Sequence, residues 1–212
     1  MEKRVVITGL GAVTPVGIGK ENFYNALLEG KSGIGPITRF DASDYATRIA
    51  GEVKDFDITQ YGVDKKEARR MDRSVEFAIG AAVLAADDAK LALDEEDLDR
   101  CGTVVGTGIG GIDSIHEVYT TLFDKGPGRV SPFAVPMMIA NMSSARVSIR
   151  LGLKGPVITD VTACTSGTNA IGDAFRIIQR GDADIMFAGG TEAAVSPAAV
   201  AGFAAMKAMS TR

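Results

Sequence analysis

The chain of 212 residues has no tryptophan, one histidine and two cysteines. The single histidine, His116, lies among polar residues on a predicted surface helix, so neither a histidine-built metal site nor a pair of catalytic histidines is available. Two cysteines, Cys101 and Cys164, are too few for a disulfide framework and fit a reducing, cytoplasmic compartment. The metal and disulfide classes are therefore excluded, and no metal or cofactor is expected.

Long apolar runs and an excess of positive charge are also missing. The apolar run after Arg4 is interrupted by Gly9 and Gly11 and is too short for a signal peptide or a membrane span. The net charge of −4 argues against a nucleic-acid-binding protein. We therefore expect no membrane and no nucleic acid among the partners. The 46% hydrophobic content is still enough for a sizeable core.

Strands and helices are predicted to alternate along the chain. Apolar runs predict strands at about 5–8, 50–53, 103–107, 156–161 and 184–188. Helical periodicity predicts helices at about 20–29, 72–93, 112–123, 137–151 and 165–180, and an apolar helix-like segment at 198–209. Asp72 is a candidate N-cap, and residues 31–70 resemble a surface excursion. The pattern predicts a single α/β domain with a mainly parallel sheet covered on both faces.

The segment Gly106–Gly111 matches G-x-G-x-x-G between a strand and a helix. This pattern is typical of dinucleotide binding, which also requires an acidic residue about 20 positions later. The chain has Val130-Ser131-Pro132-Phe133 there instead. We favour the other interpretation, in which the glycines allow a strand end and a helix to pack closely.

A basic cluster stands out in this otherwise acidic chain. It comprises Lys65, Lys66, Arg69, Arg70 and Arg73, and Lys66 and Arg70 would share a face of an emerging helix. A solvated surface is one interpretation. The other is a docking patch for an acidic partner, which salt would weaken.

The segment Val161–Gly167 places Cys164 between an apolar run and a predicted helix. The positive end of a helix dipole and its unpaired N–H groups stabilise a thiolate and can also hold an oxyanion. Cys164 is then a nucleophile that attacks carbonyl groups. A small buried cysteine that only packs is the alternative.

Taken together, these segments resemble the β-ketoacyl-acyl-carrier-protein synthases, the condensing enzymes of fatty-acid synthesis. The resemblance runs along the whole chain and rests on residues 4–11, 31–34, 66–72, 106–111, 131–133, 162–167, 181–184, 188–190 and 210–212. Ile109 and the Thr165-Ser166-Gly167 that follows Cys164 are more similar to synthase II than to synthase I.

The resemblance implies a thiolase-like fold, layered α-β-α-β-α in the full enzyme. It implies that Cys164 accepts an acyl group as a thioester, which a carbanion from decarboxylated malonyl carrier protein then attacks. By position, Ile109 would gate the acyl pocket and Phe203 would line it. Ala134 departs from the pattern, since synthase II enzymes often have a phenylalanine there. No cofactor is implied beyond the phosphopantetheine arm of the carrier protein.

The resemblance also implies partners. Lys65, Lys66, Arg69 and Arg70 fall in the segment that docks acyl carrier protein, and the strand at Pro156–Val161 would pair across a homodimer axis. The two histidines and the lysine of the family come from a C-terminal half, so residues 1–212 are expected to be the N-terminal half of the enzyme. A non-catalytic subunit similar to a chain-length factor is the alternative function.

Overall fold

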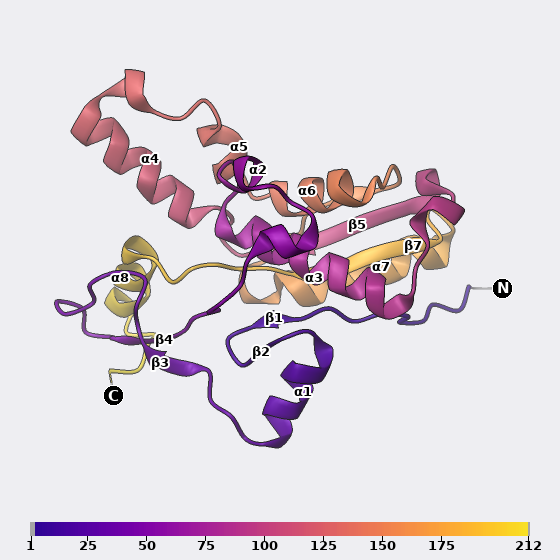
Figure 1. The fold of residues 1–212 in the computed structure, drawn as a ribbon, viewed down its shortest axis with the longest axis horizontal. Coiled ribbons are helices and arrows are strands. Elements are labelled where there is room, and N and C mark those ends of the chain that lie inside the picture. Colours follow the sequence, from indigo (N-terminus) through magenta and orange to yellow (C-terminus); the bar gives the residue numbers. More distant parts are fainter. Residues whose placement is uncertain (1–2, 212) are drawn as a thin grey trace.

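The computed structural model describes residues 3–211 (Figure 1). Its helices are α1 (Lys20–Leu28), α2 (Lys65–Ala68), α3 (Arg73–Ala89), α4 (Ile112–Lys125), α5 (Ala134–Met138), α6 (Met142–Leu151), α7 (Ser166–Arg180) and α8 (Pro197–Ala205). Its strands are β1 (Val13–Thr14), β2 (Gly17–Ile18), β3 (Ile34–Pro36), β4 (Ile49–Gly51), β5 (Cys101–Gly106), β6 (Val157–Ile158) and β7 (Ile185–Gly190). Strands β1 and β2 form one small antiparallel pair, and β3 and β4 form another.

The centre of the fold is a parallel sheet with the strand order β6-β5-β7. Successive residues of a strand point to opposite faces, and both faces of β5 are covered. Val104 belongs to a core cluster with Ala170, Ala174 and Ile177 of α7, whereas Val105 belongs to a second cluster formed with α3 and α6. Figure 1 shows α7 and α6 on either side of the sheet. The predicted α/β class and the sheet covered on both faces are confirmed.

Helix α3 begins where the sequence predicts. Asp72 is its N-cap and accepts a hydrogen bond from the backbone N–H of Ser74 at 3.0 Å. Val75, Ala78 and Ile79 on its inner face are buried in the second core cluster. The helix ends four residues earlier than expected, because Lys90 adopts a left-handed conformation with φ of 51°.

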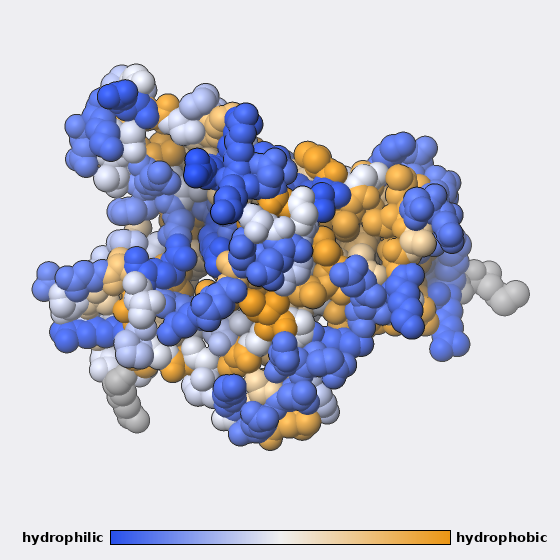
Figure 2. Space-filling view, viewed as in Figure 1, coloured by the Kyte–Doolittle hydropathy of each residue, from blue (hydrophilic) through white to orange (hydrophobic). Residues whose placement is uncertain are grey.

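The N-terminal segment differs from its prediction. Residues 5–8 were expected to form a strand, but none of residues 3–12 lies in one. Gly11 instead approaches α3 so closely that a Cβ on it would lie 1.9 Å from the carbonyl oxygen of Ala81. A cavity of about 530 Å³ separates this segment from α7 and β7, and Figure 2 shows apolar surface near the position of β5 and β7. An apolar run predicts a strand only where a neighbouring strand completes its hydrogen bonds.

Two further expectations need correction. The predicted surface excursion at 31–70 is not wholly on the surface, because Phe56, Ile58 and Val63 are buried in the core with α3. The predicted helix at 137–151 is divided into α5 and α6. The break coincides with the packing of the glycine loop, where the N–H of Gly111 donates to Met138 O at 3.3 Å.

Candidate functional site

The loops that follow the three parallel strands meet at one edge of the sheet, as the carboxyl ends of parallel strands must. The N–H of Thr107, after β5, donates to Asp160 O, after β6, at 3.1 Å. The N–H of Thr191, after β7, donates to Gly106 O at 3.0 Å. The loop that ends at Cys164 therefore lies beside the glycine loop Thr107–Gly111.

Cys164 is exposed in the short 3-10 turn Ala163–Thr165, immediately before α7. Ala163 has a φ of 55°, a left-handed conformation that an alanine seldom adopts and that residues at functional sites adopt more often. The other cysteine has the opposite environment. Cys101 is 1% exposed, its Sγ donates to Asp97 O at 3.3 Å, and burial raises the pKa of its thiol. Of the two cysteines, Cys101 is therefore the buried one and Cys164 the accessible one.

The hydroxyl of Ser166 connects the segments around Cys164. It accepts from the N–H of Thr162 at 2.9 Å. Its own proton can be donated to Ala163 O, at 2.6 Å, or to Thr107 O, at 3.1 Å. Thr165, the N-cap of α7, turns its hydroxyl back to Thr162 O at 2.7 Å instead of capping the first turn. The N–H groups at the start of α7 can therefore serve a bound group near the sulfur.

Glycines at this edge allow backbones to approach each other. A Cβ on Gly106 would lie 2.2 Å from Ser166 O, and one on Gly190 would lie 2.8 Å from the Cα of Gly167. Gly110 has a φ of 80°, which favours glycine. These contacts fit the close-packing interpretation of Gly106–Gly111.

Glu192 is a site residue that the sequence reasoning missed. Its carboxylate accepts from the N–H of Gly108 at 2.7 Å and from the N–H of Ile109 at 3.2 Å. Those N–H groups are the ones that a pyrophosphate would require in a dinucleotide site, which further disfavours that interpretation. Burial raises the pKa of Glu192, and the hydrogen bonds to Gly108 and Ile109 oppose this effect. The sequence signal that could have identified Glu192 is its place two residues after β7, a strand that ends at this edge of the sheet.

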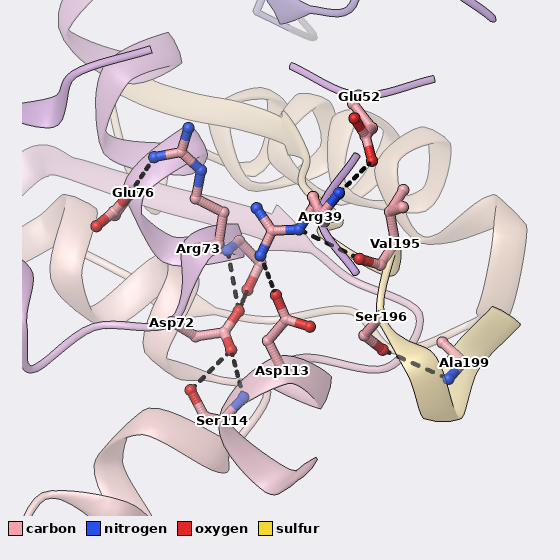
Figure 3. A network of polar contacts seen from close by, with 11 residues as sticks. Arg39, Glu52, Asp72, Arg73, Glu76, Asp113, Ser114, Val195, Ser196 and Ala199 are labelled. Atoms are coloured by element: carbon pink, nitrogen blue, oxygen red, sulfur yellow. Dashed lines mark hydrogen bonds and ion pairs between the residues drawn. The ribbon is translucent and has the colours of Figure 1, made fainter. Parts of the chain in front are cut away.

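The loop after Glu192 is held by a second polar network (Figure 3). Arg39 donates to Val195 O at 3.2 Å and forms an ion pair with Asp113 at 2.5 Å. Asp72 accepts from the hydroxyl and the N–H of Ser114, at 2.8 and 3.1 Å, which joins the starts of α3 and α4. Ser196 caps α8 by accepting from the N–H of Ala199 at 3.4 Å. The network fixes α8 relative to the site.

The predicted pocket residues lie on two of these elements. Ile109 is 37% exposed in the glycine loop, next to Gly108, whose added Cβ would lie 3.6 Å from Ala163 O. The structure thus brings Ile109 to the loop of Cys164. Phe203 is 40% exposed on α8, and its place in an acyl pocket stays a prediction.

The basic cluster lies on and after α2. Lys65, Lys66 and Arg69 are exposed, whereas the guanidinium of Arg70 lies 4.3 Å from the ring centre of Phe133. Helix α2 ends at Ala68, so the predicted shared helical face of Lys66 and Arg70 is wrong. Asp64 caps this helix by accepting from the N–H groups of Lys66 and Glu67.

Within residues 3–211, no cluster of histidine, cysteine or acidic side chains could hold a metal ion. In the same part of the chain, no helix is long and apolar enough to cross a membrane.

The sequence matches the family model of the β-ketoacyl synthase N-terminal domain over residues 2–212. The chain belongs to the β-ketoacyl synthase family. It is 56% identical over 211 residues to 3-oxoacyl-[acyl-carrier-protein] synthase 2 of Synechocystis, with 100% of the chain and 50% of that relative covered. It is 52% identical over 209 residues to the protein of the same name from Staphylococcus aureus, with 99% and 50% covered. The chain thus spans about half the length of these curated relatives.

Solved ketosynthase structures share the fold. A β-ketoacyl synthase from Burkholderia phymatum has a TM-score of 0.87 and 33% identity, covering 100% of this chain and 52% of that one. A type II polyketide ketosynthase, solved in complex with its acyl carrier protein and bound to a hexaketide, has a TM-score of 0.86 and 28% identity, covering 100% and 51%. The fold of this family member is therefore thiolase-like.

Proposed function

We propose that this chain is the N-terminal half of a 3-oxoacyl-[acyl-carrier-protein] synthase of fatty-acid elongation, with Cys164 as the acyl-accepting nucleophile. The observation that carries the proposal is an exposed thiol at the start of α7, at the carboxyl edge of the parallel sheet. The curated relatives of the same name support the reaction class.

The proposed chemistry has two steps. The sulfur of Cys164 attacks the carbonyl carbon of an acyl thioester, and the carrier thiol leaves with a proton as the new thioester forms. N–H groups at the start of α7 stabilise the oxyanion. Malonyl carrier protein then loses CO₂, and the resulting carbanion attacks the Cys164 thioester. A carbon–carbon bond forms, the Cys164 thiolate leaves, and the chain is two carbons longer.

The second step requires groups beyond this chain. Stabilising a carbanion beside the thioester needs neutral hydrogen-bond donors, and the only histidine, His116, lies in α4. We propose that a C-terminal half supplies them and completes the α-β-α-β-α layers, and we call the two halves together the complete synthase. A homodimer through β6 and a cytoplasmic location belong to the same proposal, as does the absence of any cofactor besides the phosphopantetheine arm.

The basic cluster supplies the proposed docking surface for acyl carrier protein. The exposed side chains of Lys65, Lys66 and Arg69 lie together on one short helix and its end, with Arg70 beside them on Phe133. An acidic carrier would be steered to this surface by charge complementarity.

The test is acylation of Cys164 in the complete synthase. Incubation with acyl-carrier protein should add one acyl mass to the tryptic peptide of Cys164, and Cys164→Ala should lose both this mass and the 3-oxoacyl product. Cys101→Ala is the matched control and should keep both. Full condensation by Cys164→Ala would reject the proposal. A complete synthase that is never acylated would favour the non-catalytic chain-length-factor alternative, which the retained, exposed cysteine argues against.

A further inference from the structure

The carboxylate of Glu192 is the meeting point of three donors from one loop. Oε2 lies 2.7 Å from the N of Gly108 and 3.2 Å from the N of Ile109, and Oε1 lies 3.3 Å from the hydroxyl of Thr107. A carboxylate is the side chain that accepts several hydrogen bonds at once without needing a donor in return. Glu192 therefore supplies the acceptor oxygens for all three donors of this loop.

The loop that Glu192 holds is a tight turn around Ile109. The hydroxyl of Thr107, which is 1% exposed, also accepts from the N–H of Gly110 at 3.1 Å. Three successive N–H groups, from Gly108 to Gly110, are thus directed to Glu192 or to Thr107. Because these bonds fix the backbone on both sides of Ile109, they also set the direction of its Cα–Cβ bond.

Glu192 can act as an anchor because the preceding residue, Thr191, is held to the sheet and to α3. The N–H of Thr191 donates to Gly106 O at 3.0 Å, and its hydroxyl donates to Ser74 O at 2.6 Å. On the other side of the loop, Gly108 lies near Ala163, the residue before Cys164, because a Cβ on Gly108 would be 3.6 Å from Ala163 O. Glu192 therefore connects the sheet to the loop of Ile109, and this loop in turn lies beside the loop of Cys164.

We propose that Glu192 is the positioning residue that fixes Ile109 beside Cys164 and thereby sets the acyl-chain length that the synthase prefers. The inference rests on the proposed function, because it takes Cys164 as the acyl acceptor and Ile109 as the gate of the acyl pocket. Glu192 touches neither substrate nor sulfur in this scheme and acts only through the loop.

The test compares Glu192→Gln and Glu192→Ala with the wild type in the complete synthase. The measured quantity is the ratio of kcat/KM for a long acyl substrate to kcat/KM for a short one. Loss of the anchor lets Ile109 move, so this ratio should change at least about tenfold, the lower end of the range by which pockets discriminate single methylene groups. Glutamine keeps one acceptor oxygen, so its effect should be the smaller of the two.

A matched control exists in the same chain. Glu52 accepts from the N–H groups of Thr38 and Arg39, at 2.9 and 3.2 Å, and from the hydroxyl of Thr38 at 2.6 Å. The donors are again two N–H groups and a threonine hydroxyl, but they lie just after β3, and Glu52 lies just after β4, instead of beside Cys164. Glu52→Gln should lower the melting temperature and change the selectivity ratio much less than Glu192→Gln does, because Glu52 contacts the network around α8 only through the N–H of Arg39.

A double-mutant cycle identifies the route of the effect. If Glu192 acts through Ile109, Glu192→Gln should change the ratio in the wild type and have little further effect in an Ile109→Ala background. Equal effects in both backgrounds would overturn the inference. So would an unchanged ratio in folded Glu192 variants.

A spectroscopic measurement on the wild type remains possible even if the variants fail to fold. It also separates this inference from the proposed function. In wild-type protein labelled with ¹⁵N-glycine and ¹⁵N-isoleucine, the amide signals of Gly108 and Ile109 should titrate together, with a midpoint above 4.5, the ordinary pKa of a glutamate. Signals that do not titrate would overturn the inference. Titrating signals in a protein whose Cys164 is never acylated would reject only the proposed function.

Discussion

Gly106, the last residue of β5, and Ser166, the first residue of α7, are in backbone contact. A Cβ on Gly106 would lie 2.2 Å from the carbonyl oxygen and 2.8 Å from the Cβ of Ser166. The contact brings the loop of Cys164 onto the end of the central strand. A side chain larger than hydrogen at position 106 must push α7 away from the sheet.

Gly106→Ala should therefore destabilise the protein by at least about 2 kcal/mol, because overpacking against rigid backbone is costly. Unfolding of the complete synthase in denaturant, followed by circular dichroism, measures this. Gly128→Ala is the control, since nothing lies within 4 Å of a Cβ there, and it should change stability by less than about 0.5 kcal/mol. Equal stability of the two variants would contradict the contact.

The two cysteines should differ in reactivity. Cys164 is exposed, whereas Cys101 is 1% exposed with a raised pKa. Iodoacetamide should alkylate Cys164 at least about tenfold faster than Cys101 in the native protein, because only an accessible thiolate reacts. Peptide mass spectrometry over time measures both rates. The rates should converge in denaturant, and equal rates in the native protein would be inconsistent with the burial of Cys101.

Charge reversal should weaken docking of the carrier protein. Lys65→Glu with Arg69→Glu should raise KM for acyl-carrier protein about tenfold while kcat remains near the wild-type value, because surface charges act on encounter. KM for a small acyl thioester without the carrier should stay unchanged. Lys31→Glu with Lys154→Glu makes the same change in net charge at two other exposed positions and should leave both KM values in place. If this control pair raises KM equally, the docking surface lies elsewhere.

The ion pair between Arg39 and Asp113 offers a test of the network around α8. Burial raises the pKa of Asp113, and the positive charge of Arg39 offsets part of this increase. Arg39→Met leaves a half-buried carboxylate without its cation and should cost about 1–2 kcal/mol of stability. Adding Asp113→Asn should restore part of that loss. Thermal unfolding of both variants measures their stabilities. A double variant that is less stable than Arg39→Met would contradict this account of the ion pair.

Stability should depend on pH through Glu192. Its pKa in the folded protein is raised above the ordinary value of 4.5, so the folded state takes up this proton at a higher pH than the unfolded state does. The contribution of this group to the free energy of unfolding is full below pH 4.5 and is lost as pH rises through the raised pKa. The difference in unfolding free energy between wild type and Glu192→Gln should therefore grow as pH falls through this window. Denaturant titrations at several pH values measure this difference. A difference that shrinks on acidification would contradict a raised pKa of Glu192.

Local sequence signals were sufficient to predict the longer helices and the strands of the central sheet. Helix ends depend on local chemistry, so Asp72 as N-cap and Gly181, with a φ of 88° after α7, could be predicted from the residues alone. The alternation of apolar runs and helices gave the α/β class. The same local signals placed Cys164 between a strand and a helix, where the structure has it.

Which of these segments touch depends on the packing of residues that are distant in the sequence. Glu192 holds the N–H of Gly108 from 84 positions along the chain, and no local pattern encodes such a pairing. The core position of Phe56 and Ile58 and the lack of a strand at residues 5–8 are of the same kind. An apolar side chain favours burial, but the packing of distant elements determines which surface buries it. The sequence therefore determined the nucleophile candidate, and the fold decided what surrounds it.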